Sequence, residues 1–408
     1  MRRPSTALAA LVLVFSVPAV VTACGALKAA PETTADDGGT GDDTEPTDDD
    51  GSETYLDGGK RPRDAAHADA NDPAAEPCSE VTCPVETVAE NLHGPVAVAV
   101  NATHLFWIEV ASTIPNAGGF GQLIRLAKGA TCNDRSCFDV LDPFVIDGEL
   151  EGRAIFNTAI ALGPNDVCYT QSYNIPPSHS IACFSLSSLL KRSLASGTGP
   201  SVALWTGATE ARWAIGAYET TKGSIRGRAL DGGTAATLAP GRPDPTSVTG
   251  DGTSTYWTER AAAGAPPGSV TVLRPDGGIS ELATNRSGPT AVKVHGGYAY
   301  WLEYESRLVM RVRTDGIGTP EQIATTEPHP FALVVDTSGV YWASAGAAQT
   351  GSEGSIARAP LTPGGKTTLM MTNIRNVYDV AADGEAIYVA SIGADLDEGK
   401  ILRMKKVQ

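Results

Sequence analysis

The side chains best placed for chemistry are acids that recur at one distance from an aromatic residue. Each lies two positions after a tryptophan: Glu109, Glu259 and Glu303. Residues two apart on a β-strand point to the same side, so each glutamate is expected beside its tryptophan. Arginines recur on the segment after the aromatic one: Arg125, Arg311, Arg358 and Arg403. A ring of such acids would bind a cation such as calcium. The interpretation we favour is a set of Glu–Arg pairs that join neighbouring repeats, and in that case no cofactor is expected.

The six histidines offer a second candidate site. His93 and His329 fall in equivalent connections of the repeat described below, and Glu327 lies beside the second. These three residues would suit a metal or acid–base site on one face, although solvated loop histidines are the interpretation we favour. No serine or cysteine lies in a recognisable nucleophile motif, and no catalytic residue is predicted.

The cysteines other than Cys24 form three local pairs along the chain. An even number of cysteines in an exported protein favours disulfides over free thiols. We predict three bridges, although other connectivities stay open: Cys78–Cys83, Cys132–Cys137 and Cys168–Cys183. Zinc is the alternative, but no histidine lies near either of the two closely spaced pairs.

These residues belong to a repeat that predicts the fold. An alternating apolar segment, a turn and an aromatic pair recur at steps of 62, 88, 44, 41 and 47 residues. Since 88 is twice 44, the unit is about 44 residues long, which is typical of β-propeller blades. Tryptophans mark four of the repeats: Trp107, Trp257, Trp301 and Trp342. We predict an all-β propeller of seven four-stranded blades, with six as the alternative if the weak unit near Trp213 merges with a neighbour. The segment Val85–Asn91 is expected to pair with the last blade and close the ring.

The blades resemble those of the YWTD propellers, best known from the low-density-lipoprotein receptor. Tyr256-Trp257-Thr258-Glu259 is close to that tetrapeptide, and Ile356-Ala357-Arg358 matches the strand that follows it. The resemblance covers about residues 84–408 and implies a fold, since one fold serves many functions. YWTD propellers have six blades, whereas this chain predicts seven. More broadly, the chain is similar to propeller lipoproteins of myxobacterial type.

The N-terminus predicts export and a lipid anchor. Arg2 and Arg3 precede an apolar run, as in a secretion signal. The sequence Val21-Thr22-Ala23-Cys24 resembles the lipobox of bacterial lipoproteins, and the resemblance implies cleavage before Cys24 and lipidation of that cysteine; ordinary cleavage is the alternative. Gly25 follows, which by the enterobacterial sorting pattern favours the outer membrane.

The segment after the cysteine has the composition of a disordered tether. Residues 25–77 hold most of the acidic excess behind the net charge of −16 and almost no aliphatic side chains beyond alanine. The predicted organisation is a signal peptide at 1–23, an acidic tether at 24–77 and a propeller at 78–408. Because the chain is acidic, nucleic acid is not an expected partner.

The predicted function is a non-catalytic binding module on the bacterial cell envelope. Its expected partners are the membrane, through the lipid, and a protein or glycan that binds the face where the longest connections gather. One alternative is a propeller enzyme, a lyase or lactonase-like hydrolase with an axial metal site. Another is a structural component of the envelope. An enzyme would bring His, Glu and Arg together at the axis, whereas a binding module would expose an apolar or aromatic surface.

Overall fold

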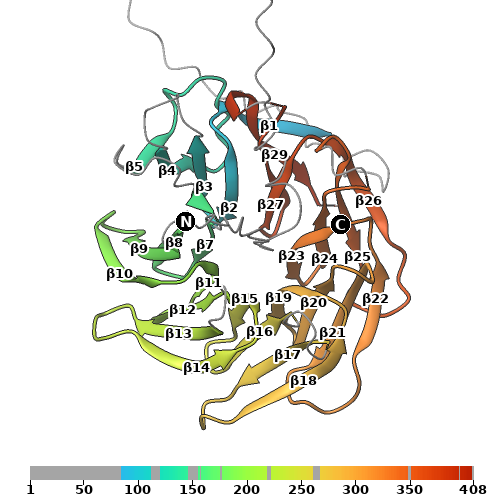
Figure 1. Ribbon diagram of the computed structural model, residues 1–408. Helices are drawn as coiled ribbons and strands as arrows, with labels where there is room; N and C mark the ends of the chain where they lie inside the picture. The colour runs from blue at the N-terminus through green and yellow to red at the C-terminus, as the bar shows by residue number, and fades with distance from the viewer. Residues whose placement is uncertain are drawn as a thin grey trace, which may run out of the picture. The chain divides into compact units, whose positions relative to one another are not determined.

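Seven antiparallel sheets stand around one axis and form a β-propeller (Figure 1). This computed structural model describes residues 84–111, 120–145, 155–156, 158–174, 177–217, 222–260, 267–347, 351–394 and 396–406. The predicted all-β, seven-bladed fold is therefore confirmed, and the six-bladed alternative is wrong because the unit around Trp213 forms a blade of its own. The predicted pairing of Cys78 with Cys83, and the predicted signal and tether, lie outside the described residues.

Each blade is a meander whose first strand lies nearest the axis. Blade 1 comprises β2 (Pro95–Val100), β3 (His104–Ala111), β4 (Phe120–Ala127) and β5 (Asp139–Val145). Blade 2 has an inner strand in two pieces and comprises β6 (Ile155–Phe156), β7 (Ile160–Leu162), β8 (Asp166–Asn174), β9 (Pro177–Ser185) and β10 (Lys191–Thr198). Blade 3 comprises β11 (Ser201–Thr206), β12 (Glu210–Ile215), β13 (Gly223–Ala229) and β14 (Ala236–Arg242).

Blades 4 to 6 follow the same order along the chain, whereas blade 7 takes its outer strand from residues before blade 1. Blade 4 comprises β15 (Pro245–Gly250), β16 (Thr255–Glu259), β17 (Gly268–Leu273) and β18 (Ile279–Arg286). Blade 5 comprises β19 (Pro289–His295), β20 (Tyr298–Glu303), β21 (Leu308–Arg313) and β22 (Glu321–Thr325). Blade 6 comprises β23 (Pro330–Asp336), β24 (Gly339–Ser344), β25 (Gly354–Ala359) and β26 (Thr368–Ile374). Blade 7 comprises β27 (Val377–Ala382), β28 (Ala386–Ser391), β29 (Gly399–Lys405) and β1 (Val85–Leu92).

The N-terminal strand closes the ring, as the sequence predicts. β1 pairs antiparallel with β29, and Glu86 lies directly opposite Arg403. The turn after β4 also holds β1, because the Cys132 amide donates to the Val88 carbonyl at 2.7 Å. The outer edge of the last blade is thereby covered by a strand from the other end of the chain.

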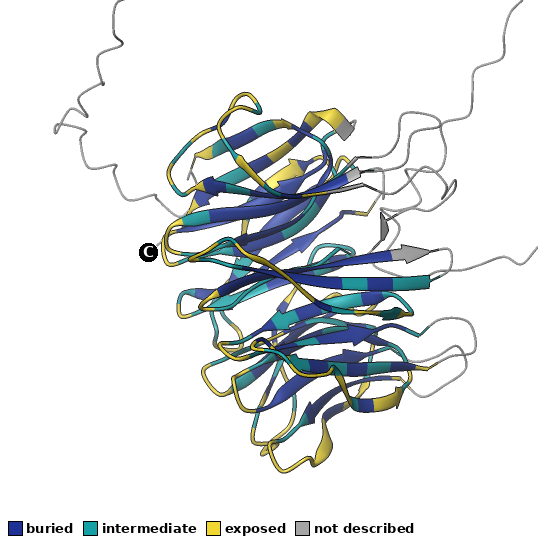
Figure 2. Ribbon diagram, turned by 90° about the vertical axis from the view of Figure 1, so that its left-hand side faces the viewer, coloured by how far each residue is buried: buried dark blue, intermediate teal, exposed yellow. Residues whose placement is uncertain are grey.

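The aromatic pair of each repeat explains how the blades pack. Neighbouring residues on a strand point to opposite faces, so one member of the pair faces the preceding blade and the other the next. Tyr256 packs in one cluster with Trp301, and Tyr300 packs in the next cluster with Trp342. Around the closure, Tyr388 of blade 7 packs with Trp107 of blade 1. Buried residues consequently run along the strands between the blades, and exposed residues gather at the turns (Figure 2).

Helical structure is nearly absent from the described part of the chain. One 3₁₀ turn, η2 (Leu396–Glu398), lies before β29. Within the described ranges, no helix is long and apolar enough to cross a membrane.

Candidate functional site

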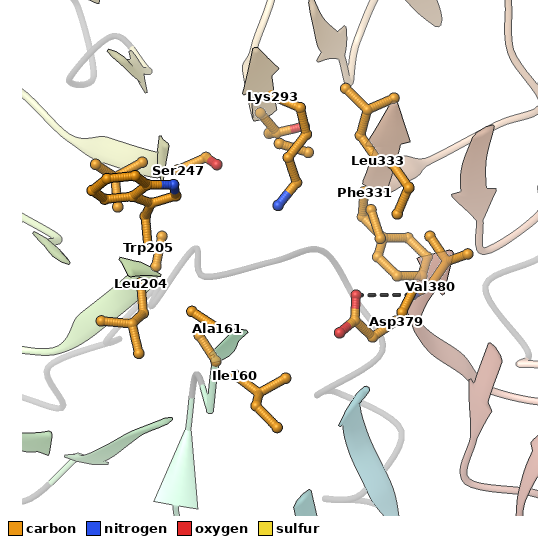
Figure 3. A pocket seen from close by; sticks show the side chains of 18 of the residues that line it. Ile160, Ala161, Leu204, Trp205, Ser247, Lys293, Phe331, Leu333, Asp379 and Val380 are labelled. Atoms are coloured by element: carbon orange, nitrogen blue, oxygen red, sulfur yellow. Dashed lines mark hydrogen bonds between the residues drawn. The ribbon is translucent and has the colours of Figure 1, made fainter. Parts of the chain in front are cut away.

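An axial cavity of about 950 Å³ is enclosed by the inner strands of all seven blades. Apolar side chains form most of its wall, including Ile160, Leu204 and Phe331 (Figure 3). Trp205 also lines it, whereas the other five tryptophans are fully buried in the blades. No histidine or cysteine is among the described residues that line the cavity.

Two opposite charges interrupt the apolar wall. Lys293 of β19 and Asp379 of β27 both point into the cavity, from blades 5 and 7 (Figure 3). Their positions in the repeat are unusual, as the strand registers show. Lys293 lies opposite Tyr300, the first residue of the aromatic pair in blade 5. The residues at the equivalent position of the other blades are Ala99, Ala161, Trp205, Thr249, Val334 and Ala381.

Asp379 occupies a position where other blades carry a small side chain. It follows a register shift in the inner strand, and the equivalent residues are Ala97, Ala203, Ser247 and Ala332. Its two carboxylate oxygens accept hydrogen bonds from the backbone amides of Val98, at 3.0 Å, and Val380, at 2.8 Å. Ser247 makes the same kind of bond to the next blade, since its hydroxyl accepts from the Val292 amide at 3.1 Å. Asp379 therefore ties blade 7 to blade 1 as well as carrying charge.

Loss of hydration inside the channel shifts the titration of both groups toward their neutral forms, although the side chain of Asp379 is half-buried and that of Lys293 is exposed to the channel. It raises the pKa of Asp379 to about 6, although the backbone hydrogen bonds and the charge of Lys293 act against the shift. It lowers the pKa of Lys293, and the charge of Asp379 opposes that shift. Within the described residues, the ammonium of Lys293 has no hydrogen-bond partner or ion-pair partner within contact distance, and it keeps access to the space of the cavity.

Further polar groups lie at one end of the cavity. Arg260 directly follows the second strand of blade 4, and Tyr304 and Glu305 follow the second strand of blade 5. Arg260 forms an ion pair with Asp244 at 3.1 Å. This end of the channel is the one at which the second strands finish and the next inner strands begin.

The recurring glutamates lie in the blades and not on the cavity wall. Glu109, Glu259 and Glu303 are buried, and each accepts a hydrogen bond from the indole of its own tryptophan. Glu259 pairs with Arg242, and Glu303 pairs with Arg286 at 2.7 Å, so both glutamates join neighbouring blades. Glu109 pairs at 2.8 Å with Arg135 of its own blade.

The recurring arginines have partners other than these glutamates. The expected pairing of the two sets is wrong, because each arginine has a partner within its own blade; Arg311 in addition donates to the Leu361 carbonyl of blade 6 at 2.6 Å. Three of them pair with the acid directly opposite on the outer strand: Arg125 with Asp139, Arg311 with Glu321 and Arg403 with Glu86. Arg358 donates to the Ser338 carbonyl at 2.7 Å.

The three loop residues of the second candidate site have separate partners. His93 contacts Asp397 at 2.5 Å, and His329 contacts the Gly346 carbonyl at 2.8 Å. Glu327 accepts a hydrogen bond from Trp342 at 3.1 Å. Among the residues that the structure describes, no group of three or more His, Cys, Asp or Glu side chains could hold a metal ion.

Two of the predicted disulfides are confirmed. Cys132–Cys137 closes the turn between β4 and β5. Cys168–Cys183 joins residues directly opposite each other on β8 and β9.

Sequence reasoning missed Lys293 and Asp379. The signal was present as two charged residues in inner segments that are otherwise small or apolar. Without the strand registers, nothing in the spacing of residues 293 and 379 indicates that they face one cavity.

Comparison with known proteins defines the class of fold. No family profile matches the chain, and no curated protein sequence is similar to it. Virginiamycin B lyase from Staphylococcus aureus is a similar structure, with a TM-score of 0.55 and 14% identity over 80% of this chain and 99% of the lyase. A streptogramin B lyase structure has a TM-score of 0.52 and 14% identity over 79% of this chain and 97% of its own.

A more distant propeller occurs in a nidogen/laminin complex. Its TM-score is 0.43, with 15% identity over 64% of this chain and 90% of its own. The likeness to the two lyase structures, at 14% identity, shows a shared fold, and the β-propeller is the class to which this chain is assigned.

Proposed function

We propose that the protein is a lipid-anchored binding module of a bacterial cell envelope whose propeller takes up an organic ligand, or an extended part of a larger one, in the axial channel. The observation that carries the proposal is the cavity itself. Its volume of about 950 Å³ lies within the range of small-molecule sites, and its wall is mainly apolar with few polar groups. A ligand that enters would gain apolar contact and meet two charges able to orient it.

The envelope part of the proposal depends on the N-terminal sequence. The lipobox-like Val21-Thr22-Ala23-Cys24 supports lipidation of Cys24, and the acidic stretch that follows supports a tether between membrane and propeller. The residue after the cysteine supports the outer membrane as the location. In this proposal the partner is a protein or a glycan, and an extended part of that partner enters the axial channel.

The lyase activity named for two similar structures is not carried over to this chain. Identity of 14% supports a common fold, and a function has to be argued from the site. The inner strands of the described cavity wall offer a binding surface with one lysine and one aspartate, with Arg260 and Glu305 at one end, and that chemistry suits recognition.

Thermal unfolding with candidate ligands tests the channel as the binding site. The full-length protein would be heated with peptides, envelope glycan fragments and organic acids, beside an Ala161→Phe variant that fills part of the cavity. A ligand present at about 100 times its dissociation constant should stabilise the fold by about 2.7 kcal/mol. We expect a ligand that raises the melting temperature of the wild type and not that of the variant.

The control is a substitution of similar size away from the cavity. Ile317 is exposed, and Ile317→Phe should leave any ligand effect unchanged. A ligand effect that survives in Ala161→Phe would place binding elsewhere and contradict the proposal.

A further inference from the structure

The ammonium of Lys293 is the cation of the described cavity wall with unused hydrogen-bonding capacity, because the other cation there, Arg260, pairs with Asp244 at 3.1 Å. A lysine ammonium carries three donors, and within the described residues no acceptor contacts that of Lys293. Asp379 interacts with it through charge, but the Asp379 oxygens already accept the amides of Val98 and Val380. Around Lys293 the cavity is thus better prepared to receive an anion than a cation, and the other acid of the described wall, Glu305, lies at one end of the channel.

The surroundings of Lys293 restrict the kind of anion. Leu204, Trp205 and Phe331 present apolar and aromatic surface to the same space (Figure 3). A small, strongly hydrated inorganic anion would leave this surface in contact with water. An anion with an apolar body would cover it and gain from its burial.

We propose that the axial channel binds an organic carboxylate with an apolar or aromatic body, and that Lys293 receives the carboxylate. The inference rests on the proposed function, since it names the class of ligand for the same channel. Asp379 acts as a positioning residue, because its charge favours the protonated lysine. Trp205 and Phe331 contact the body of the ligand.

The test compares an acid with its neutral isostere. The probes are 4-phenylbutyrate and 4-phenylbutyramide, with inorganic phosphate as a third, titrated calorimetrically into the full-length protein. We expect the acid to bind at least about tenfold more tightly than the amide, since hydrogen bonds to charged groups contribute about 1.5–3 kcal/mol and each 1.4 kcal/mol is tenfold. Phosphate should bind more weakly than 4-phenylbutyrate.

Variants then assign the preference to one side chain. Lys293→Met keeps most of the side-chain volume and should bring the two affinities within about twofold, whereas Lys293→Arg should keep the preference for the acid. Lys400→Met is the matched control, because Lys400 is exposed on β29, and it should behave as the wild type. A purely structural role of Lys293 would alter the melting temperature without changing the ratio of the two affinities.

Three outcomes would overturn the inference. They are equal binding of acid and amide to the wild type, an acid preference that survives in Lys293→Met, and no binding of the acid. Equal binding that is lost in Ala161→Phe would leave the proposed channel site intact while removing its selectivity for carboxylates. The two proposals therefore fail in distinguishable ways.

Discussion

Glu327 accepts a hydrogen bond from the indole of Trp342 at 3.1 Å and so replaces an acid that blade 6 lacks in its own second strand. In blades 4 and 5 the acceptor lies two positions after the tryptophan, where blade 6 has Ser344. Glu327 lies three residues before the proline that begins an inner strand. Arginines occupy that position before blades 4 and 5: Arg242 and Arg286. In blade 6 the acid, Glu327, therefore occupies the position of these arginines, and it still accepts the hydrogen bond from the tryptophan indole.

This exchange predicts a stability cost that a second substitution restores. Glu327→Arg should leave the Trp342 indole without its acceptor and lower the free energy of unfolding by about 1–3 kcal/mol. The double variant Glu327→Arg with Ser344→Glu recreates the arrangement of blades 4 and 5, so it should recover most of the loss. Urea unfolding measures both values. A double variant less stable than Glu327→Arg would contradict the equivalence of the two arrangements.

The half-buried carboxyl of Asp379 predicts a pH dependence of stability. Its pKa is raised to about 6 by burial, so the folded state binds the proton more tightly than the unfolded state. Its contribution to stability should increase as the pH falls through 6. Relative to Asp379→Asn, the wild type should gain about 1 kcal/mol in free energy of unfolding between pH 7.5 and pH 5.

The same comparison removes the effect of other titrating groups. Urea unfolding of both proteins at the two pH values gives the difference directly, since groups outside the channel change alike in both. A difference that stays constant, or that grows in favour of the asparagine variant at low pH, would show that folding does not raise the pKa of Asp379.

Ring closure predicts that β1 is required for cooperative folding. Deleting residues 85–92 exposes the edge of β29 and removes Ala89 and Leu92, both fully buried, from the cluster between blades 7 and 1. We expect loss of a single unfolding transition and aggregation at the exposed edge. Calorimetry and light scattering measure these effects.

A milder substitution separates strand pairing from surface charge. Glu86→Gln weakens the ion pair with Arg403 and should cost at most about 1 kcal/mol. If the protein without 85–92 unfolded like the wild type, β1 would not close the ring in solution.

The proposed anchor predicts release by one substitution. Cys24→Ser removes the thiol to which the lipid would attach, so the protein should leave the membrane fraction, and incorporation of an alkynyl fatty acid should be lost. Cell fractionation and labelling measure the two effects. A variant that stays with the membrane while losing the label would show that the anchor lies elsewhere.

The repeat made the fold predictable from sequence, because each aromatic pair has to face two neighbouring blades. Closure was predictable as well, since Val85–Asn91 matches an outer strand and the last repeat has none of its own. The partners of the arginines were not. They follow from the register of β4 with β5 and of β21 with β22, which places Arg125 opposite Asp139 and Arg311 opposite Glu321.

The candidate site was harder to predict for a related reason. Lys293 and Asp379 lie on the inner strands of different blades, and they meet in one cavity because the ring closes. The number of residues between Lys293 and Asp379 does not indicate that they line one cavity. Neither charge belongs to the repeat, because most other blades have small or apolar residues at these two positions.

The central claim, that the channel is the ligand site, is tested most directly by the fluorescence of Trp205. This tryptophan lines the cavity, whereas the other five are buried in the blades, so a ligand in the channel should change the emission of the wild type and not that of Trp205→Phe. Titration with 4-phenylbutyrate should give that result, with a midpoint equal to the calorimetric dissociation constant. An emission change of the same size in both proteins, or calorimetric binding with no change in the wild type, would contradict binding in the channel.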